Sequence, residues 1–277
     1  MKIVVVGLGV IGGSFTMALK EAGYDDVYGI DINEESLKKA KKLGLIKEGF
    51  TNGQEIVKSA DFIIISLYPR LVKQFIIDNK DNFKDGAVIT DATGIKKLFI
   101  EDIVKILPEN IDFVFGHPMA GREKKGIDFA TSQVFKGANY ILTPVARNKE
   151  ENLNMIEDLV YKIGFKRIKR ITPEYHDEMI GFTSQLPHSL AVALVNSDVE
   201  GRDTGSFIGD SYRDLTRIAN INEDLWSELF LGNKDNLLKS IEDFETELDK
   251  IKDAIKNDDK EALKEIFRKS TKRREKL

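Results

Sequence analysis

The chain has 277 residues, of which 42% are hydrophobic, and its 42 basic and 46 acidic residues give a net charge of −4. This length favours two domains of ordinary size, each with a real hydrophobic core. The near-balanced charge excludes an overall attraction to nucleic acid or to an anionic membrane surface, so an anionic ligand must meet a local basic cluster.

The absence of cysteine narrows the possible chemistry further. Without cysteine the chain has no disulfide framework, no thiolate zinc site and no cysteine nucleophile. Glycines interrupt the apolar N-terminal run, which argues against a signal peptide, and no apolar stretch approaches the ~20 residues that a membrane-spanning helix needs. We therefore expect a cytoplasmic protein without a membrane partner.

The first part of the chain alternates short apolar runs with amphipathic segments. Strand-like runs lie at residues 2–6, 26–31, 60–67, 86–93, 113–118 and 139–144. A typical helical segment between them begins after Asn33, a capping residue, and ends at Gly44. Because strands that are apolar almost throughout are buried on both faces, the pattern predicts an α/β domain with a parallel, doubly wound, Rossmann-type sheet.

The pattern changes near Arg170. From Thr172 onward helical spacing replaces the strand-like runs, with Thr172 as a cap and Pro173 at the first helical position. The last part contains a heptad seam formed by Leu237, Ile241, Phe244, Leu248, Ile251 and Ile255. This seam fits either a helix packed on its own domain or a subunit interface. We predict one domain over residues 1–170 and an all-helical domain over residues 171–277.

A glycine fingerprint follows the first strand-like run. Gly7, Gly9 and Gly12 have the G-x-G-x-x-G spacing between a strand and a helix, and Asp31 ends the second strand about twenty residues later. These glycines allow a tight turn, close approach of the backbone to a pyrophosphate, and close helix packing, while the helix N-terminus faces the phosphates. Asp31 would bind ribose hydroxyls and repel a 2′-phosphate. The sequence therefore predicts NAD, rather than NADP, as the cofactor of residues 1–170.

Ligands of such sheets bind beyond the carboxyl ends of the strands. The residues at these ends are therefore candidate cofactor contacts. They are Gly7, Leu8, Gly9, Val10, Ile11 and Gly12 after the first strand, Asp31 after the second, Ser66, Leu67 and Tyr68 after the next, and Asp91 and Thr93 after the one that follows.

His117 lies on the same predicted rim, held between Gly116 and Pro118. An isolated histidine is more often a capping or core residue, but this position favours a catalytic one. A neutral imidazole facing the nicotinamide is suited to hydrogen-bond a reacting hydroxyl group. No second histidine or carboxylate lies nearby at metal-ligand spacing, so we expect no metal.

The helical half carries a second polar set, whose members are spaced four, three and four residues apart. They are Asp177, Gly181, Ser184 and His188. This spacing predicts one face of one helix, bent by Pro187, whose partner is either a ligand or an interdomain hydrogen-bond network. Further on, Arg213 and Arg217 are one helical turn apart and form a candidate clamp for substrate carboxylates, with a structural salt bridge as the alternative.

Five segments taken together resemble one protein family. In chain order they are GLGVIGGS, DATGIK, GHPMAGREKKG, TSQLPH and YRDLTRIA followed by LW. They are similar to prephenate dehydrogenase and its arogenate-specific relatives over nearly the whole chain. The resemblance implies NAD-dependent oxidative decarboxylation of prephenate to 4-hydroxyphenylpyruvate in tyrosine biosynthesis, by a homodimer formed through the helical domain. Arogenate oxidation and NAD binding without catalysis are the alternatives.

The resemblance also implies roles for single residues. By it, His117 hydrogen-bonds the C4 hydroxyl of the substrate, Arg217 binds a substrate carboxylate, and His188 lines the substrate pocket. Glu123 is implied as a gate that pairs with Arg217, and Asp177 as a support of the site.

One position departs from the family pattern. Gly94 stands where members often carry a serine that contacts substrate or cofactor. We expect Thr93, one position earlier, to replace that contact. The set of expected substrate-binding residues is therefore His188, Glu123, Thr93, Arg213 and Asp177.

Overall fold

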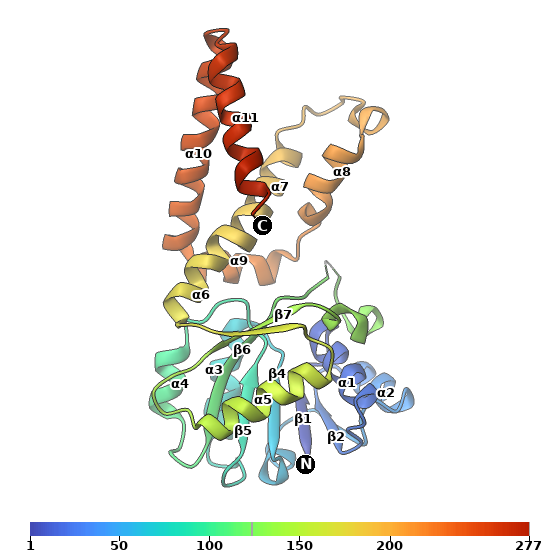
Figure 1. The fold of residues 1–277 in the computed structure, drawn as a ribbon. Helices are drawn as coiled ribbons and strands as arrows, with labels where there is room; N and C mark the ends of the chain where they lie inside the picture. Colours follow the sequence, from blue (N-terminus) through green and yellow to red (C-terminus); the bar gives the residue numbers. More distant parts are fainter. Residues whose placement is uncertain (123, 277) are drawn as a thin grey trace.

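The computed structural model describes residues 1–122 and 124–276, which form an α/β part followed by a helical part (Figure 1). Within these residues, eight strands form one sheet in the order β3-β2-β1-β4-β5-β6-β7-β8. They are β1 (Ile3–Val6), β2 (Val27–Ile30), β3 (Gly49–Phe50), β4 (Phe62–Ile65), β5 (Val88–Asp91), β6 (Asp112–Pro118), β7 (Asn139–Thr143) and β8 (Arg167–Arg170).

The sheet is parallel except for one pair. Strand β1 pairs in parallel with β2 and with β4, and the parallel pairing continues through β5 to β6. β7 runs antiparallel to β6, with His117 opposite Ile141. The predicted doubly wound sheet is thus confirmed, and its expected parallel pairing holds for every pair except β6 and β7. The described residues between β6 and β7 contain only short 3-10 turns, at Ile127–Phe129 and Ser132–Phe135. They contain no crossover helix, which a parallel β7 would need to start from the other end of the strands.

Two edge strands have no clear sequence signal. β3 has only two residues, and β8 reads Arg-Ile-Lys-Arg, with Arg167 and Lys169 exposed. Charged residues on an edge strand oppose pairing with another sheet, and the same residues hide the strand from a search for apolar runs.

Helices cover both faces of the sheet (Figure 1). α1 (Val10–Glu21), α2 (Glu34–Lys42) and α5 (Glu150–Lys162) pack on the face of Ile3 and Val5. α3 (Pro69–Asn79) and α4 (Ile100–Ile106) pack on the opposite face. Burial of both faces explains why the central strands are apolar almost throughout.

The helical part begins three residues after β8. It consists of α6 (Pro173–Ile180), a π-helix (Gly181–Gln185), α7 (Leu186–Asn196), α8 (Asp210–Thr216), α9 (Glu223–Gly232), α10 (Lys234–Lys256) and α11 (Lys260–Arg274). Short 3-10 turns lie at Thr204–Phe207 and Arg217–Ala219. In the described part of the chain, no helix combines the length and apolarity needed to cross a membrane. The exact domain boundary at residue 170 stays a prediction.

The heptad seam lies along α10, which stands away from the sheet beside α11 (Figure 1). At its base Leu237 is buried, whereas Leu248 and Ile255 are 48% and 58% exposed. The base of the seam therefore packs on its own domain, and its outer half is open in the single chain.

Candidate active site

The loop between β1 and α1 is shaped to receive a phosphate group. Gly7 has φ = +82°, a left-handed conformation, and a Cβ there would lie 2.5 Å from the carbonyl oxygen of Ser66. A Cβ at Gly12 would overlap the carbonyl oxygen of Gly7. Beyond its chain neighbours, no described residue comes within 4 Å of a Cβ added at Gly9, and no side chain caps the helix that follows. The loop thus offers both space and backbone N–H donors to a pyrophosphate.

Asp31 lies beside this loop at the end of β2. Its Oδ2 accepts a hydrogen bond from the backbone N–H of Leu8 at 2.6 Å, and its Oδ1 accepts one from Asn33 at 2.8 Å. The carboxylate is therefore held in one orientation next to the glycine loop. This arrangement fits a dinucleotide whose adenosine ribose carries free hydroxyls.

Asp31→Asn is expected to weaken the preference for NAD over NADP. The variant removes the charge that repels a 2′-phosphate but keeps the size of the side chain. We expect the ratio of kcat/KM values for NAD and NADP to fall by about tenfold or more, as measured by steady-state kinetics with both cofactors. An unchanged ratio in a variant that melts like the wild type would contradict the role assigned to Asp31.

The rim residues after β4 face in different directions. Leu67 packs under Gly7, where an added Cβ would lie 2.9 Å from it. The Ser66 hydroxyl is buried and has no hydrogen-bond partner in the described part of the chain. The Tyr68 hydroxyl accepts a hydrogen bond from Asn222 of the helical part at 2.8 Å. As cofactor contacts these three residues stay predictions.

A buried ion pair lies under the rim at the end of β5. The side chains of Asp91 and Lys96 are both 0% exposed, and Lys96 Nζ lies 2.6 Å from Asp91 Oδ2. Lys96 also donates to Thr93 Oγ1 at 3.1 Å and to the carbonyl oxygen of Gly116, while Asp91 Oδ1 accepts from the Gly116 N–H at 3.0 Å. Burial lowers the pKa of Lys96, and Asp91 opposes that shift. The pair therefore fixes both polar backbone groups of the residue before His117.

Thr93 belongs to this buried cluster. Its hydroxyl donates to Asp91 and accepts from Lys96. The expectation that Thr93 replaces a serine contact stays a prediction, but its hydroxyl is already engaged within the protein.

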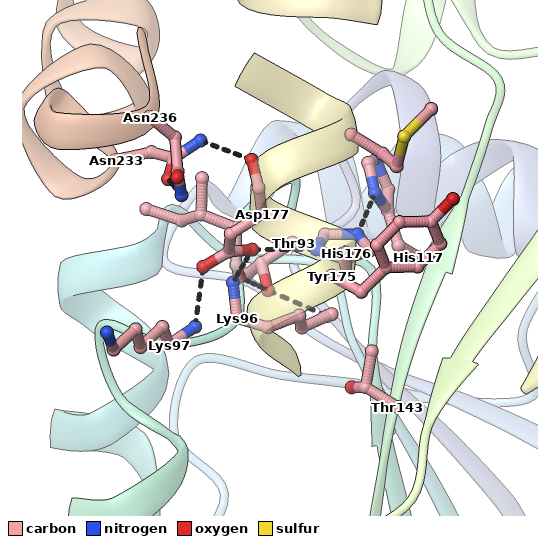
Figure 2. Close-up of polar contacts among 12 residues, drawn as sticks. Thr93, Lys96, Lys97, His117, Thr143, Tyr175, His176, Asp177, Asn233 and Asn236 are labelled. Atoms are coloured by element: carbon pink, nitrogen blue, oxygen red, sulfur yellow. Dashed lines mark hydrogen bonds and ion pairs between the residues drawn. The ribbon is translucent and has the colours of Figure 1, made fainter. Parts of the chain in front are cut away.

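His117 lies within β6, one residue before its end, and its imidazole meets a second histidine. His117 Nδ1 is 2.8 Å from Nε2 of His176, and His176 Nδ1 is 2.7 Å from Oδ1 of Asp177 (Figure 2). His117 comes from the sheet, whereas the other two residues come from α6. The three side chains therefore form one hydrogen-bonded chain across the junction of the two parts.

Both histidines are held neutral. Burial lowers the pKa of His117 well below its usual value; the charge of Lys96 acts in the same direction, as would a proton on His176. Burial also lowers the pKa of His176, although the hydrogen bond to Asp177 opposes this shift. With an ordinary histidine pKa of about 6.5, both rings are uncharged at neutral pH.

Asp177 is engaged entirely by the protein. It is 1% exposed, and its two oxygens accept the backbone N–H groups of Lys96 and Lys97 at 2.9 and 2.8 Å (Figure 2). Its own carbonyl oxygen accepts from Asn233 at 2.8 Å. As a substrate contact Asp177 stays a prediction. Its geometry places it behind His176, where it supports the site and ties α6 to the loop after β5.

The helix that carries Asp177 is not α-helical throughout. The expectation of one α-helical face from Asp177 to His188 is wrong, because the π-helix Gly181–Gln185 separates α6 from α7. Pro187 has no N–H to donate to the carbonyl group four residues back, and a π-bulge is one way in which a helix accommodates such a loss. Asp177 and His188 consequently make contacts with different partners.

His188 is oriented by α7 and α9. Its Nδ1 lies 2.8 Å from the carbonyl oxygen of Ser184, so this nitrogen is the donor. The ring stacks on Trp226, with 3.7 Å between the ring centroids and an angle of 29°. An imidazole with one face on an indole is held firmly, which suits a pocket-lining residue; its contact with substrate stays a prediction.

The predicted arginine clamp is divided. Arg213 pairs with Asp210 at 2.7 Å on the exposed side of α8, which is the structural salt bridge considered as its alternative. Arg217 begins the 3-10 turn that follows α8. Glu123, the predicted gate for Arg217, lies outside the described residues. The carboxylate-binding roles of Arg213 and Arg217 stay predictions.

Gly94 lies directly in front of His117. A Cβ built at Gly94 would be 3.8 Å from Nε2 of His117 and 3.3 Å from a methyl carbon of Leu229. A serine hydroxyl here would reach His117 Nε2, and this chain lacks that group. Glycine at position 94 therefore leaves His117 Nε2 without a side-chain partner from that position.

Lys96 and His176 are the site residues that the sequence analysis did not assign. Lys96 ends the segment DATGIK, and His176 precedes Asp177 in the segment TPEYHD. A histidine directly before an aspartate was the available signal. Among the described residues, no cluster of three or more histidine and acidic side chains is arranged to hold a metal ion.

Comparison of the sequence with models of known protein families identifies the family of this chain. The sequence model for the nucleotide-binding domain of prephenate dehydrogenase matches residues 15–169, and the model for its dimerization domain matches residues 172–269. The chain belongs to the prephenate dehydrogenase family. The predicted family, Rossmann-type α/β fold with a helical second part, and NAD-dependent oxidoreductase class are thereby confirmed.

Relatives in this family differ in the substrate that they are named for. Prephenate dehydrogenase of Bacillus subtilis (strain 168) is 30% identical over 96% of this chain and 73% of its own length. The structure of Aquifex aeolicus prephenate dehydrogenase with hydroxyphenyl propionate and NAD⁺ is 32% identical, with a TM-score of 0.90 over 100% of this chain and 99% of that one. Synechocystis arogenate dehydrogenase is 26% identical, with a TM-score of 0.84 over 100% and 99% of the two chains.

Proposed function

We propose that the chain catalyses the NAD-dependent oxidative decarboxylation of prephenate to 4-hydroxyphenylpyruvate. The observation that carries this proposal is the half-buried His117, which a lowered pKa keeps neutral and whose Nε2 lies opposite Gly94. His117 lies near the carboxyl end of β6, at the end of the sheet that also carries the glycine loop. NAD, when bound at the glycine loop beside Asp31, would supply the acceptor for the hydride that leaves C4 of the substrate. The ring carboxylate leaves C1 as carbon dioxide, and the ring becomes a phenol that keeps the hydroxyl proton.

His117 supplies the acceptor for the C4 hydroxyl in this reaction. As the hydride leaves, positive charge develops on the C–OH group, and a hydrogen bond to His117 Nε2 stabilises that charge. A neutral imidazole is required, because a protonated Nε2 would repel the developing charge. The lowered pKa of His117 keeps the ring in this form at neutral pH.

Substrate carboxylates need positive charge in a chain whose net charge is −4. Arg217, at the start of a 3-10 turn beyond α8, is the residue that we assign to a carboxylate. His188, fixed on Trp226, lines the pocket wall in this proposal.

Arg217→Ala is expected to raise KM for prephenate by about 10- to 100-fold with little change in NAD affinity. The reason is that a guanidinium group binds a carboxylate bidentately, whereas alanine offers no charge. Steady-state kinetics and a separate NAD titration measure the two effects. Arg213→Ala is the matched control and is expected to have a small effect, because Arg213 pairs with Asp210 on the surface. Equal effects of the two variants would contradict the assignment.

The proposed assembly is a cytoplasmic homodimer formed through the helical part. The match to a dimerization domain and the exposed outer half of the α10 seam support this proposal. Burial of Leu248 and Ile255 in a second copy would complete the heptad pattern that the sequence carries.

Arogenate is the second candidate substrate, because the chain also resembles an arogenate dehydrogenase. The two substrates differ in the side chain, a keto group in prephenate and an amino group in arogenate, and share the ring at which His117 acts. The test is the rate of NADH or NADPH formation with each substrate and each cofactor. We expect the highest kcat/KM for prephenate with NAD; no turnover above background by the folded protein would reject the proposal.

A further inference from the structure

We propose that His176 and Asp177 form a relay that holds His117 in a single tautomer, with the proton on Nδ1 and with Nε2 as the acceptor that faces the substrate. His176 and Asp177 are positioning residues in this proposal, because they act through His117. The relay rests on the proposed function only for the identity of the hydroxyl group that Nε2 meets.

The direction of each hydrogen bond follows from Asp177. A carboxylate accepts but does not donate, so the proton of the 2.7 Å contact lies on Nδ1 of His176. A neutral His176 therefore has an unprotonated Nε2, which accepts. The 2.8 Å contact then requires the proton on Nδ1 of His117, which leaves His117 Nε2 unprotonated.

Asp177 is fixed independently of the histidines. The backbone N–H groups of Lys96 and Lys97 hold its two oxygens, and neither donor can reverse its role. Its partner His176 is 1% exposed, so water does not compete for the ring. The hydrogen-bonded chain thus begins at the Asp177 carboxylate, which can only accept, and it leaves Nε2 of His117 as an acceptor.

The charged groups around the two imidazole rings stabilise a partial positive charge on His117. The charged groups that face them are Asp177 from α6, and Lys96 and Asp91 from the end of β5. Lys96 and Asp91 largely cancel as an ion pair, and Asp177 provides the negative charge behind His176. When the C4 hydroxyl donates to Nε2, the partial positive charge on His117 can spread through His176 towards Asp177. The hydroxyl proton returns with the phenol, so no net proton is released.

The relay also explains how this chain orients His117 with glycine at position 94. A side chain in front of the ring would hold Nε2 directly, but Gly94 has none. Orientation must come from the other nitrogen, and His176 is the group that meets it.

The first test reads the tautomers without using activity. The chain has three histidines, so ¹⁵N-histidine labelling gives a simple long-range ¹H–¹⁵N spectrum, and single replacements assign its signals. We expect both His117 and His176 of the intact protein to carry the proton on Nδ1 at neutral pH. A spectrum with His117 protonated on Nε2 would overturn the relay, whatever reaction the protein catalyses.

The second test separates hydrogen bonding from packing. His176→Leu fills much of the space but accepts no hydrogen bond, and it is expected to lower kcat by about tenfold or more. KM for prephenate and the Kd for NAD are expected to change by less than about twofold, because His176 is 1% exposed. His176→Gln places an amide oxygen near the position of Nε2, and it is expected to recover kcat to within about threefold of the wild type.

The control is Glu178→Gln, an exposed change on the same helix that is expected to leave kcat unaltered. Wild-type kcat in the leucine variant would overturn the relay, and so would a glutamine variant as slow as the leucine variant although both melt like the wild type. If the wild type turns over arogenate alone, the same variants are assayed with arogenate. Failure with both substrates rejects the proposed function, and the tautomer spectrum still decides the relay.

Discussion

Replacing His117 with asparagine is expected to lower kcat by about 10²- to 10⁴-fold, the range typical of a lost general acid or base. Asparagine does not place an unprotonated nitrogen in front of Gly94, and its amide cannot take up the charge that develops as the hydride leaves. NAD binding is expected to persist, because the glycine loop and Asp31 are unchanged. Pre-steady-state hydride transfer and a fluorescence titration with NADH measure the two effects. An asparagine variant that keeps full activity would support the alternative of NAD binding without catalysis.

The pH dependence of the wild type provides a second check on His117. Because the pKa of His117 lies below its usual value, kcat/KM is expected to fall only at pH values below about 6.5. The stability of the fold is expected to decrease over the same pH range. The unfolded chain takes up protons on these histidines below about pH 6.5, whereas the folded chain does not, so the free energy of unfolding decreases as the pH falls from that value.

Replacing Lys96 with methionine is expected to destabilise the protein by about 3–5 kcal/mol. The variant leaves the Asp91 carboxylate fully buried without its cation and releases the carbonyl group of Gly116. Urea unfolding measures the loss, and kcat is expected to fall as well, because Gly116 immediately precedes His117.

Lys97→Met is the matched control for this variant. Lys97 is exposed, and its contact with Asp177 uses the backbone N–H, which methionine retains. The double change Asp91→Asn with Lys96→Met is expected to cost less than Lys96→Met alone, since it leaves no unpaired charge. Equal stability of the two single lysine variants would show that the ion pair does not hold the site together.

The sequence predicted the parts of this protein that depend on local patterns. The glycine loop, Asp31 and the central strands follow rules about spacing and burial that act within a few residues, and the structure contains each of them. His117 was predicted as a site residue from its place at the end of a strand-like run, and it lies one residue before the end of β6. The residues that hold it could not be found in this way, because they are distant along the chain. His176 lies 59 residues from His117, and Lys96 lies 20 residues from Gly116, which it contacts.

The errors of prediction have equally specific causes. The antiparallel strand β7 follows from a connection without a helix, which strand propensity does not reveal. The π-helix Gly181–Gln185 lies just before Pro187. The missing N–H of a proline indicates an irregular helix, but it does not specify a π-helix. Arg213 and Arg217 have the spacing of a clamp, but Arg213 lies in α8 and Arg217 begins the 3-10 turn that follows it, so they do not share one α-helix; their carboxylate-binding roles stay predictions.

The antiparallel pairing of β6 with β7 fixes the backbone of His117 separately from the connection that follows it. β6 continues beyond its last parallel partner, and Phe115 to Pro118 pair only with β7, so the backbone of His117 belongs to a strand. The described residues between Pro118 and Asn139, which leave out residue 123, lie outside the sheet. Insertions or exchanges in that excursion can reshape the approach to the rim while the imidazole keeps its place. A change of substrate side chain therefore does not require the reacting centre to be rebuilt.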